Sequence, residues 1–328
     1  MSMEETGDHF EKLFESAPIS LWEEDFRGIK KFFDSLRADG ITDLEEYLSS
    51  HPEEIEKNMR RIRVTRVNHE TLKMFGAASE AELLHGLDRI FRDEMLAHFR
   101  AQLLVLWNGE MDWSGESINY RLDGEPLNIR IRWRVLPDCL ADWECVMISI
   151  ENITVLKKAE EYLRYLGTHD VMTELYNRAF FEETLRGLET TRQDPIAVLV
   201  MDLNNLKPTN DHYGHQAGDK LIRRTAEVLK AGAVERTITA RIGGDEFVVL
   251  MPGAGLVEAN ELIDRIQSLV VMNNKFYGEP ELSLSLGAAV SKPGISLEKV
   301  ISLADDEMYK NKGLYHRRRK EDYWEGNW

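Results

Sequence analysis

Three carboxylate side chains follow two apolar runs in the second half of the chain. Asp202 ends the run at 196–201, and Asp245 and Glu246 come directly after the glycine pair at 243–244. If the runs form neighbouring strands, the carboxylates meet, and such oxygen donors suit one or two Mg²⁺ ions that keep water and phosphate as further ligands. Two glycines let the backbone turn sharply and leave room for a triphosphate. These residues predict a divalent-cation site for nucleotide phosphates.

Further polar residues occupy positions from which one nucleotide could be contacted. Lys207 follows the first acid by five residues and offers a point charge to a phosphate. Asn210 and Asp219, with His215 between them, combine an amide and a carboxylate that can read the donor edge of guanine. Lys312 lies on the last predicted helix, where it could reach the terminal phosphates. Each is an ordinary surface group by itself, but together they indicate a nucleotide site.

The elements that must position these residues alternate between helix and strand. Helices interleaved with strands, with one tight Gly-Gly hairpin, predict an α+β domain whose mixed sheet is covered by helices. We expect helices at 169–190, 215–232, 256–273 and 296–313, and strands at 196–203, 237–242, 246–251 and 281–290.

Four segments of this region resemble the GGDEF domain of diguanylate cyclases. They are the entry motif at 169–178, the segment at 202–219, the run Arg-Ile-Gly-Gly-Asp-Glu-Phe at 241–247 and the exit at 304–312. The resemblance covers residues 166–316, and it implies a fold like the palm of adenylyl cyclases and polymerases. It also implies condensation of two GTP molecules into cyclic di-GMP with release of pyrophosphate. Because one domain holds one GTP, catalysis should require a homodimer.

The resemblance also implies a role for each site residue. Asp202, the backbone carbonyl of Leu203 and Asp245 would hold Mg²⁺, with Mn²⁺ as an alternative. Glu246 would help to bind the metal or activate the ribose 3′-hydroxyl, so that the catalytic group is Glu246, Asp245 and Lys207. The substrate contacts implied are guanine recognition by Asn210 and Asp219 with His215 nearby, charge neutralisation by Lys207 and Lys312, and a phosphate path along the backbone of Asn205 and Leu206.

Three positions depart from the family pattern. The second acid that often comes two residues after the first is Asn204 here, which predicts weaker metal binding. The exit often continues Gly-Arg-Asn, whereas Tyr-His-Arg follows at 315–317, leaving Arg317 or Arg318 as candidates to replace one phosphate-binding arginine. The product-inhibition motif Arg-x-x-Asp corresponds to Val-Glu-Arg-Thr at 234–237, which predicts no feedback inhibition through that site.

The first half of the chain indicates a second domain. We expect residues 1–60 to form a helical extension or cap. The alternation of apolar residues with arginines at 128–135 is typical of a half-buried antiparallel strand. The segments at 67–84 and 148–154 resemble the early helices and the close of a PAS sensor domain, which implies an antiparallel-sheet sensor at 61–154 for an unidentified ligand.

A helical linker is expected at 155–168, before a GGDEF domain at 169–316 and a tail at 317–328. Within the linker, four apolar residues have the 3-4-3 spacing of a coiled-coil seam. A stretch of about 1.5 heptads is equally compatible with one amphipathic helix that packs on its own domain. The seam residues are Leu156, Ala159, Leu163 and Leu166.

Composition limits the classes of function. A chain of 328 residues suits two domains. The formal charge of −17 argues against a general nucleic-acid surface, although a bound cation reverses the sign locally. Cys139 and Cys145 are too few for a disulfide framework. Because no apolar run approaches the ~20 residues of a membrane span, we expect a soluble, cytoplasmic protein with neither nucleic-acid nor membrane partners.

The leading hypothesis is a PAS-regulated diguanylate cyclase that dimerises through its sensor and linker helix. A first alternative is a catalytically silent GGDEF module that acts as a GTP-binding sensor or scaffold, and the intact carboxylates and Lys207 argue against it. A second alternative is a cyclase that accepts ATP. Asp219 argues against that hypothesis, because a carboxylate suits the N–H donors of guanine.

Overall fold

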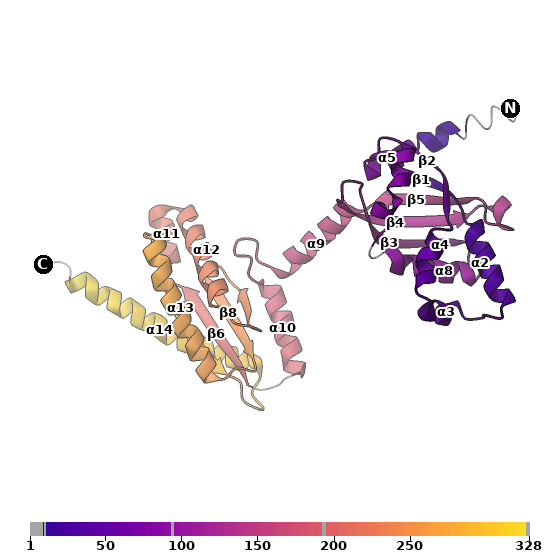
Figure 1. Ribbon diagram of the computed structural model, residues 1–328. Coiled ribbons are helices and arrows are strands. Elements are labelled where there is room, and N and C mark those ends of the chain that lie inside the picture. Colours follow the sequence, from indigo (N-terminus) through magenta and orange to yellow (C-terminus); the bar gives the residue numbers. More distant parts are fainter. Residues whose placement is uncertain (1–8, 10, 93–94, 192–194, 326–328) are drawn as a thin grey trace. The chain divides into compact units, whose positions relative to one another are not determined.

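The computed structural model describes residues 9, 11–92, 95–191 and 195–325. Residues 1–8 and 326–328 of the predicted terminal segments lie outside the described residues. The chain divides into two compact units, Met1–Glu160 and Glu161–Trp328, as Figure 1 shows. Each unit combines its own sheet with helices, so the predicted α+β fold class is confirmed.

The N-terminal unit is built on a five-stranded antiparallel sheet with the strand order β2-β1-β5-β4-β3. Along β4, buried side chains alternate with more exposed ones, because one face packs on the core and the other faces water. This pattern confirms the half-buried strand predicted at 128–135. The strands are β1 (Ser20–Asp25), β2 (Arg63–Val67), β3 (Asp112–Tyr120), β4 (Pro126–Val135) and β5 (Val146–Asn152).

The prediction of a wholly helical extension at 1–60 is wrong at β1. This strand pairs with β2 on one side and β5 on the other, so it lies inside the sheet and is no part of a cap. Trp22 and Glu24 share its buried face. A six-residue run with two glutamates gives a weak strand signal, because Glu is depleted in strands. The boundary predicted at residue 61 therefore cuts through one folded unit.

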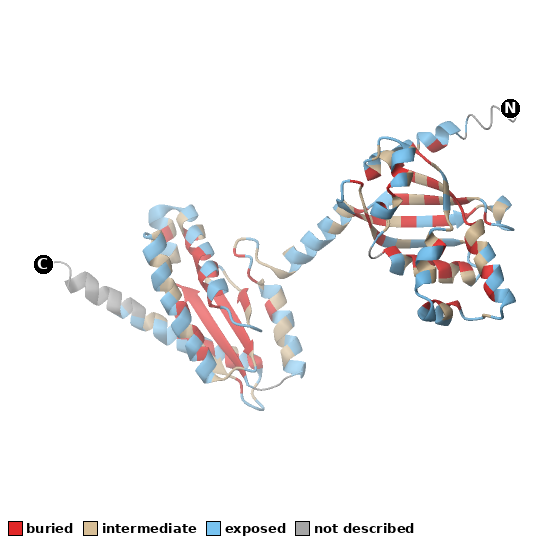
Figure 2. Cartoon of the chain, in the orientation of Figure 1, coloured by how far each residue is buried: buried red, intermediate tan, exposed pale blue. Residues whose placement is uncertain are grey.

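Helices and sheet of this unit enclose one hydrophobic core, which Figure 2 shows as buried segments on both. Several helices start at a polar residue whose side chain accepts a backbone N–H of the first turn, namely Asp43, Asn68 and Ser79. The helices are α2 (Arg27–Ala38), α3 (Leu44–Ser50), α4 (Glu53–Met59), α5 (His69–Phe75), α6 (Glu80–His85), α7 (Leu87–Ile90) and α8 (Met95–Trp107), with a 3₁₀ turn η1 (Pro137–Cys139).

Helix α9 (Thr154–Thr168) joins the two units and confirms the predicted linker helix. All of its residues are described, and none of them is buried. Leu156 and Leu163, two residues of the predicted seam, are 46% and 66% exposed. Leu156 and Leu163 are therefore left uncovered by their own domain, whereas Leu166 is half-buried.

The C-terminal unit contains a four-stranded sheet with the order β7-β8-β6-β9. Every residue of β6 is buried, which explains its continuous apolar run. The three ladders are antiparallel. Among the described residues, the predicted mixture of strand directions is limited to an isolated parallel bridge between Tyr176 and Ala240. The strands are β6 (Ile196–Leu203), β7 (Ile238–Arg241), β8 (Glu246–Pro252) and β9 (Leu284–Val290).

Successive residues of β6 face two separate cores. Leu199 belongs to a cluster with residues of α12 and α13, whereas Val198 belongs to a cluster with residues of α10 and α14. Helices therefore cover both faces of this sheet, as predicted. They are α10 (Arg178–Thr191), α11 (Leu206–Tyr213), α12 (His215–Gly232), α13 (Leu256–Tyr277) and α14 (Leu297–Glu325).

Several helices differ from the prediction. The helix expected at 169–190 begins only at Arg178, as α10. The segment after β6, expected as a loop, forms α11. Helix α14 does not end at 313 but continues to Glu325, so most of the predicted tail at 317–328 is helical. In the part of the chain that the structure describes, no helix has both the length and the apolar character that crossing a membrane requires.

Candidate active site

Two strand ends bring the predicted acids together. Strands β6 and β8 pair with Asp202 opposite Glu246. The backbone N–H of Leu203 donates a hydrogen bond to the carbonyl of Asp245 across 2.9 Å. Asp202 is buried, Asp245 is half-buried and Glu246 is exposed. The prediction that these acids come from neighbouring strand ends is confirmed, and they form a graded edge from core to solvent.

Asp202 is also the partner of Lys312 on α14. The ammonium group donates to Asp202 Oδ1 across 2.7 Å. Burial raises the pKa of Asp202 above its ordinary value, and Asp245 and Asp305 act in the same direction, while Lys312 opposes them. A carboxylate in such surroundings is stabilised in its charged form by a nearby cation. The structure thus places Lys312 at the edge of the sheet that carries Asp202, Asp245 and Glu246 (the acidic edge).

Arg241 holds the glycine turn in place. Its Nε donates to the carbonyl of Gly243 across 3.1 Å, and its Nη2 donates to the carbonyl of Gly244 across 2.9 Å. Its Nη1 lies 3.1 Å from Asp170 Oδ1, which also accepts a hydrogen bond from Thr173. Burial by itself raises the pKa of Asp170, but the hydrogen bonds from Thr173 and Arg241 outweigh it and hold the pKa below its ordinary value.

The ion pair between Asp170 and Arg241, which braces the glycine turn, was not predicted from the sequence. Both residues stand inside motifs that carry the family resemblance, but neither received a role. The available signal was one acid and one base in two motifs that are 71 residues apart. Spacing of that length does not reveal a contact, because only the fold brings the entry motif beside the turn.

The two glycines of the turn have different structural tasks. A Cβ at Gly243 would lie 2.5 Å from Glu246 Oε2, so the glutamate side chain folds back over this position. A Cβ at Gly244 would meet no described atom within 4 Å. Gly243 therefore makes room for Glu246, and the open side of the turn is at Gly244.

The side chain of Asn204, which follows β6, forms hydrogen bonds to residues at the start of β9. Its Nδ2 donates to Ser283 Oγ across 3.0 Å, and its Oδ1 accepts a hydrogen bond from Ser285 Oγ across 2.9 Å. The side chain is almost fully buried. Because both ends of the amide are engaged, the acidic edge depends on the buried Asp202 and the half-buried Asp245 for its oxygen donors.

Asn210 and Asp219 are positioned where α11 packs against α12. Asn210 Oδ1 approaches Gly218 so closely that a Cβ there would overlap it. This oxygen is buried and has no hydrogen-bond partner among the described residues. An unsatisfied buried acceptor is costly, so an N–H donor from a ligand would be favourable here. Asp219 is the next residue of α12 and is half-buried.

The remaining predicted residues lie nearer the surface. Lys207 is exposed in the first turn of α11, after Asn205 with its positive φ of 60°. Leu206 is half-buried against the core. His215 is exposed at the start of α12. The structure therefore brings Lys312 into contact with Asp202, and leaves Lys207 and His215 exposed.

The acidic edge is an incomplete set of oxygen donors. Within the described ranges, no three His, Cys, Asp or Glu side chains are arranged to hold a metal ion. Asp202, Asp245 and the carbonyl of Leu203 supply two carboxylates and one backbone oxygen. Mg²⁺ typically keeps several waters and binds through one or two carboxylates plus substrate phosphates. The donor chemistry fits such an ion and does not form a closed protein cage.

Comparisons with known proteins identify the C-terminal unit. Residues 167–318 match the family model described as diguanylate cyclase, GGDEF domain. The diguanylate cyclase DgcM of Escherichia coli (strain K12) is 32% identical over 171 residues, which cover 51% of this chain and 41% of that protein. The chain spans less than half the length of the first curated relatives that it matches, namely 25%, 23% and 44%.

Some solved structures that are similar to part of the chain contain GGDEF domains. The coiled coil and GGDEF domain of DgcB from Caulobacter crescentus, in complex with c-di-GMP, is 29% identical, with 49% of this chain and 88% of that chain covered and a TM-score of 0.44. A sensory box/GGDEF family protein from Caulobacter crescentus CB15 is 30% identical, with 45% and 99% covered and a TM-score of 0.39. The chain contains a GGDEF domain at residues 167–318.

Proposed function

We propose that this protein is a diguanylate cyclase that condenses two GTP molecules into cyclic di-GMP and releases two pyrophosphates, under the control of its N-terminal unit. The observation that carries the proposal is the register of the sheet, which sets Asp202 opposite Glu246 with Asp245 beside them. This arrangement places three carboxylates of increasing solvent exposure at one edge of the sheet, in a domain of the diguanylate cyclase family.

The phosphate end of the substrate is assigned to the acidic edge. Asp202, Asp245 and the carbonyl of Leu203 are the groups that would hold Mg²⁺ or Mn²⁺. Such a cation, when bound, neutralises phosphate charge and favours attack on the α-phosphorus. Lys312 is already at this edge, 2.7 Å from Asp202, and adds a second positive charge. Lys207 and the backbone at Leu206 line the path of the outer phosphates.

The base end of the substrate is assigned to α11 and α12. The unsatisfied Asn210 Oδ1 can accept a hydrogen bond from guanine, which carries adjacent N–H donors. Asp219 offers a further acceptor one residue after Gly218, and His215 lies at the start of the same helix. Two acceptors suit the adjacent N–H donors of guanine better than the edge of adenine, so GTP is the proposed substrate.

The chemical step is a proton transfer coupled to phosphoryl transfer. Glu246 accepts the proton of the ribose 3′-hydroxyl, and the oxygen attacks the α-phosphorus of the second GTP. A new P–O bond forms, the bond to the bridging oxygen breaks, and pyrophosphate leaves. The same step on the other GTP closes the ring. Positioning and charge neutralisation supply most of the rate enhancement in such reactions.

Two GTP molecules must meet, so the active form is proposed to be a homodimer. Support comes from α9, a fully described helix with no buried residue, whose seam residues Leu156 and Leu163 lack cover from their own domain. Two parallel copies of this helix would bury that seam against each other. The N-terminal unit is proposed to be a PAS-like sensor that alters how the two GTP sites face one another.

The test is turnover by the full-length protein. Purified protein is incubated with GTP and Mg²⁺ at several protein concentrations, and pyrophosphate and nucleotide products are measured. We expect cyclic di-GMP, with activity per molecule that rises with concentration. Asp245→Ala should abolish turnover, whereas Asp264→Ala, at an exposed position on α13, should leave it unchanged.

Two outcomes would contradict the proposal. Tight GTP binding without pyrophosphate release would indicate the silent GTP-binding module instead. Equal turnover of ATP and GTP would contradict the assignment of Asn210 and Asp219 to guanine. Thermal unfolding of each variant separates loss of chemistry from loss of fold.

A further inference from the structure

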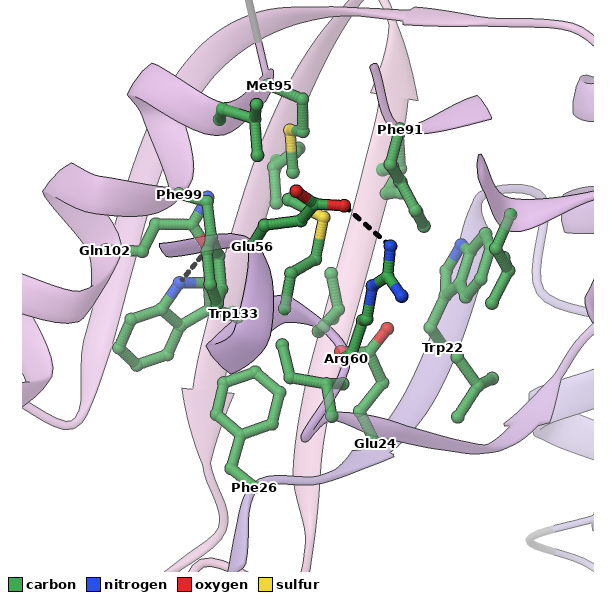
Figure 3. A pocket seen from close by; sticks show the side chains of 18 of the residues that line it. Trp22, Glu24, Phe26, Glu56, Arg60, Phe91, Met95, Phe99, Gln102 and Trp133 are labelled. Carbon is green, nitrogen blue, oxygen red and sulfur yellow. Dashed lines mark hydrogen bonds and ion pairs between the residues drawn. The ribbon is translucent and has the colours of Figure 1, made fainter. Parts of the chain in front are cut away.

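The N-terminal unit contains a partly open cavity of about 600 Å³. Its walls are the buried face of the sheet and residues of helices α4, α7 and α8. Figure 3 shows side chains that line it, among them Glu24 and Gln102. Cavities of this size are typical of sites that bind small organic molecules. Most of the lining is apolar, and five aromatic rings contribute to it: Trp22, Phe26, Phe91, Phe99 and Trp133.

Glu24 is the one buried acid of this wall within the described residues. It lies on β1, two residues after Trp22 and on the same face, and is only 7% exposed. Among the described residues its carboxyl group has no hydrogen-bond or ion-pair partner. The next residue, Asp25, is by contrast paired with Arg27 across 2.6 Å. The strand therefore satisfies one of its two buried acids and leaves the other facing the cavity.

A second polar group of the wall is also unsatisfied. Gln102 on α8 accepts a hydrogen bond from Trp133 Nε1 across 3.0 Å, which fixes its Oε1. Its Nε2 is buried and has no partner among the described residues. Two unsatisfied polar groups in a largely apolar cavity, one on β1 and one on α8, are costly to the folded protein. A ligand that pairs with both would remove that cost.

The other charged groups of the lining come from the helix side. Glu56 lies on α4, and Arg60 directly follows that helix; the two side chains pair with each other across 2.7 Å. Asp88 lies on α7, and Arg92 contacts the ring of Tyr120. None of these groups shifts the pKa of Glu24, which burial raises to about 8. The acid therefore lacks a counter-ion from the described part of the protein.

We propose that this cavity binds a protonated organic amine with an apolar body, and that Glu24 is its counter-ion. Aromatic rings favour a cation at their faces and also accommodate an apolar body. A carboxylate ligand would find no counter-ion at Glu24 to offset its burial, and a neutral ligand would gain no charge pairing. Gln102 Nε2 provides a donor for an acceptor atom elsewhere on the ligand.

The protonation state of Glu24 determines whether a proton is released when an amine binds. In the empty cavity near neutral pH the carboxyl group holds a proton, because burial disfavours its charged form. When an ammonium ion enters, Glu24 becomes charged and its proton leaves to the solvent. Binding should therefore release about one proton per amine near pH 7.

The experiment compares three probes of one shape and different charge on the full-length protein. They are 3-phenylpropylamine, 3-phenylpropan-1-ol and 3-phenylpropionate, measured by isothermal titration calorimetry in two buffers of different ionisation enthalpy. We expect the amine to bind at least roughly tenfold more tightly than the alcohol. The carboxylate should not bind, and the two buffers should reveal the released proton.

Glu24→Gln should remove the preference for the amine over the alcohol. The matched control is Glu23→Gln, because Glu23 is the neighbouring residue of β1 and does not line the cavity. The proposal is overturned if the alcohol binds as well as the amine, if none of the probes binds, or if Glu24→Gln leaves the preference intact. If Glu24→Gln fails to fold, the test is proton release on amine binding by the unmodified protein, and binding without proton release overturns the proposal. Binding is read directly, so these results are independent of any cyclase activity.

Discussion

Lys312 on α14 and Asp202 at the end of β6 form an ion pair, with 2.7 Å between Nζ and Oδ1, although 110 residues separate them in the chain. The carboxylate is nearly buried, so a cation beside it offsets the cost of its charge. In this structure that cation is a side chain at the same edge to which we assign a divalent ion. The last helix is therefore part of the candidate active site.

Lys312→Ala should impair both stability and turnover. Without the ammonium group, Asp202 is left buried and unpaired, which costs about 1–3 kcal/mol of unfolding free energy. The change also removes one positive charge from the phosphate path. The measurements are chemical denaturation and GTP turnover. Lys310→Ala is the matched control, because Lys310 lies on the same helix in an exposed pair with Glu307. Equal behaviour of the two variants would refute a special role for Lys312.

Gly218→Ala should weaken substrate binding without lowering the stability of the fold. A Cβ there overlaps Asn210 Oδ1, the end of a side chain that can move away. Alanine in a helix gains about 0.5–1 kcal/mol over glycine, so stability should be unchanged or higher. Displacing Asn210 should raise the KM for GTP by roughly tenfold through one lost hydrogen bond.

The matched control for this change is Gly187→Ala on α10, where an added Cβ meets no described atom within 4 Å. It should gain similar stability with no change in KM. If Gly218→Ala leaves KM unaltered as well, Asn210 does not read the substrate.

Arg241→Lys should slow turnover more than it weakens the fold. Lysine keeps a charge near Asp170 but cannot reproduce the fork that contacts the carbonyls of Gly243 and Gly244. We expect a loss of unfolding free energy of about 1–2 kcal/mol and a loss of kcat of roughly tenfold or more, because misplacement of catalytic groups is costly. Arg223→Lys, at an exposed position on α12, serves as the control in both assays. Full activity of Arg241→Lys would show that the brace is dispensable.

Glu24→Gln should change how stability depends on pH. Burial raises the pKa of Glu24 from 4.5 to about 8, so the folded protein holds a proton that the unfolded chain releases. Stability is therefore highest below the unfolded pKa and falls as pH rises through the folded pKa, by on the order of 5 kcal/mol for a cavity that stays dry. Unfolding of the variant and the native sequence is compared between about pH 4 and pH 9.

The variant should be the more stable protein at the alkaline end, and the difference should vanish at the acidic end. The control Glu23→Gln should show no such trend. A difference independent of pH would mean that Glu24 is charged in the folded protein throughout the range.

Much of the GGDEF domain could be predicted from local patterns. The bounds of β6 and α12 agree with the sequence prediction, because a continuous apolar run and a long amphipathic period are strong local signals. The acids at 202, 245 and 246 could be placed together because strand ends meet at a sheet edge. Helix α11 was missed, since Pro208 and the polar residues around it are typical of a loop.

The N-terminal unit was predicted less well, and β1 shows why. Its place inside the sheet depends on pairing with β2 and β5, which are about 40 and 125 residues further along the chain. A strand with two glutamates has no strong preference by itself. The cavity and its unsatisfied Glu24 were likewise beyond reach, because burial of an acid depends on everything packed around it.

The sequence alone determined the chemistry available to this protein: the three carboxylates, the lysines, the glycine turn and the two-domain order. The tertiary structure decided which of those groups touch. It joined Lys312 to Asp202 and fixed the glycine turn through Arg241 and Asp170. Among the described residues, it left Asn210 Oδ1 and the carboxyl group of Glu24 without partners. Residue types are local properties of a chain, whereas contacts, burial and the pKa values that follow from them arise only when distant segments pack together.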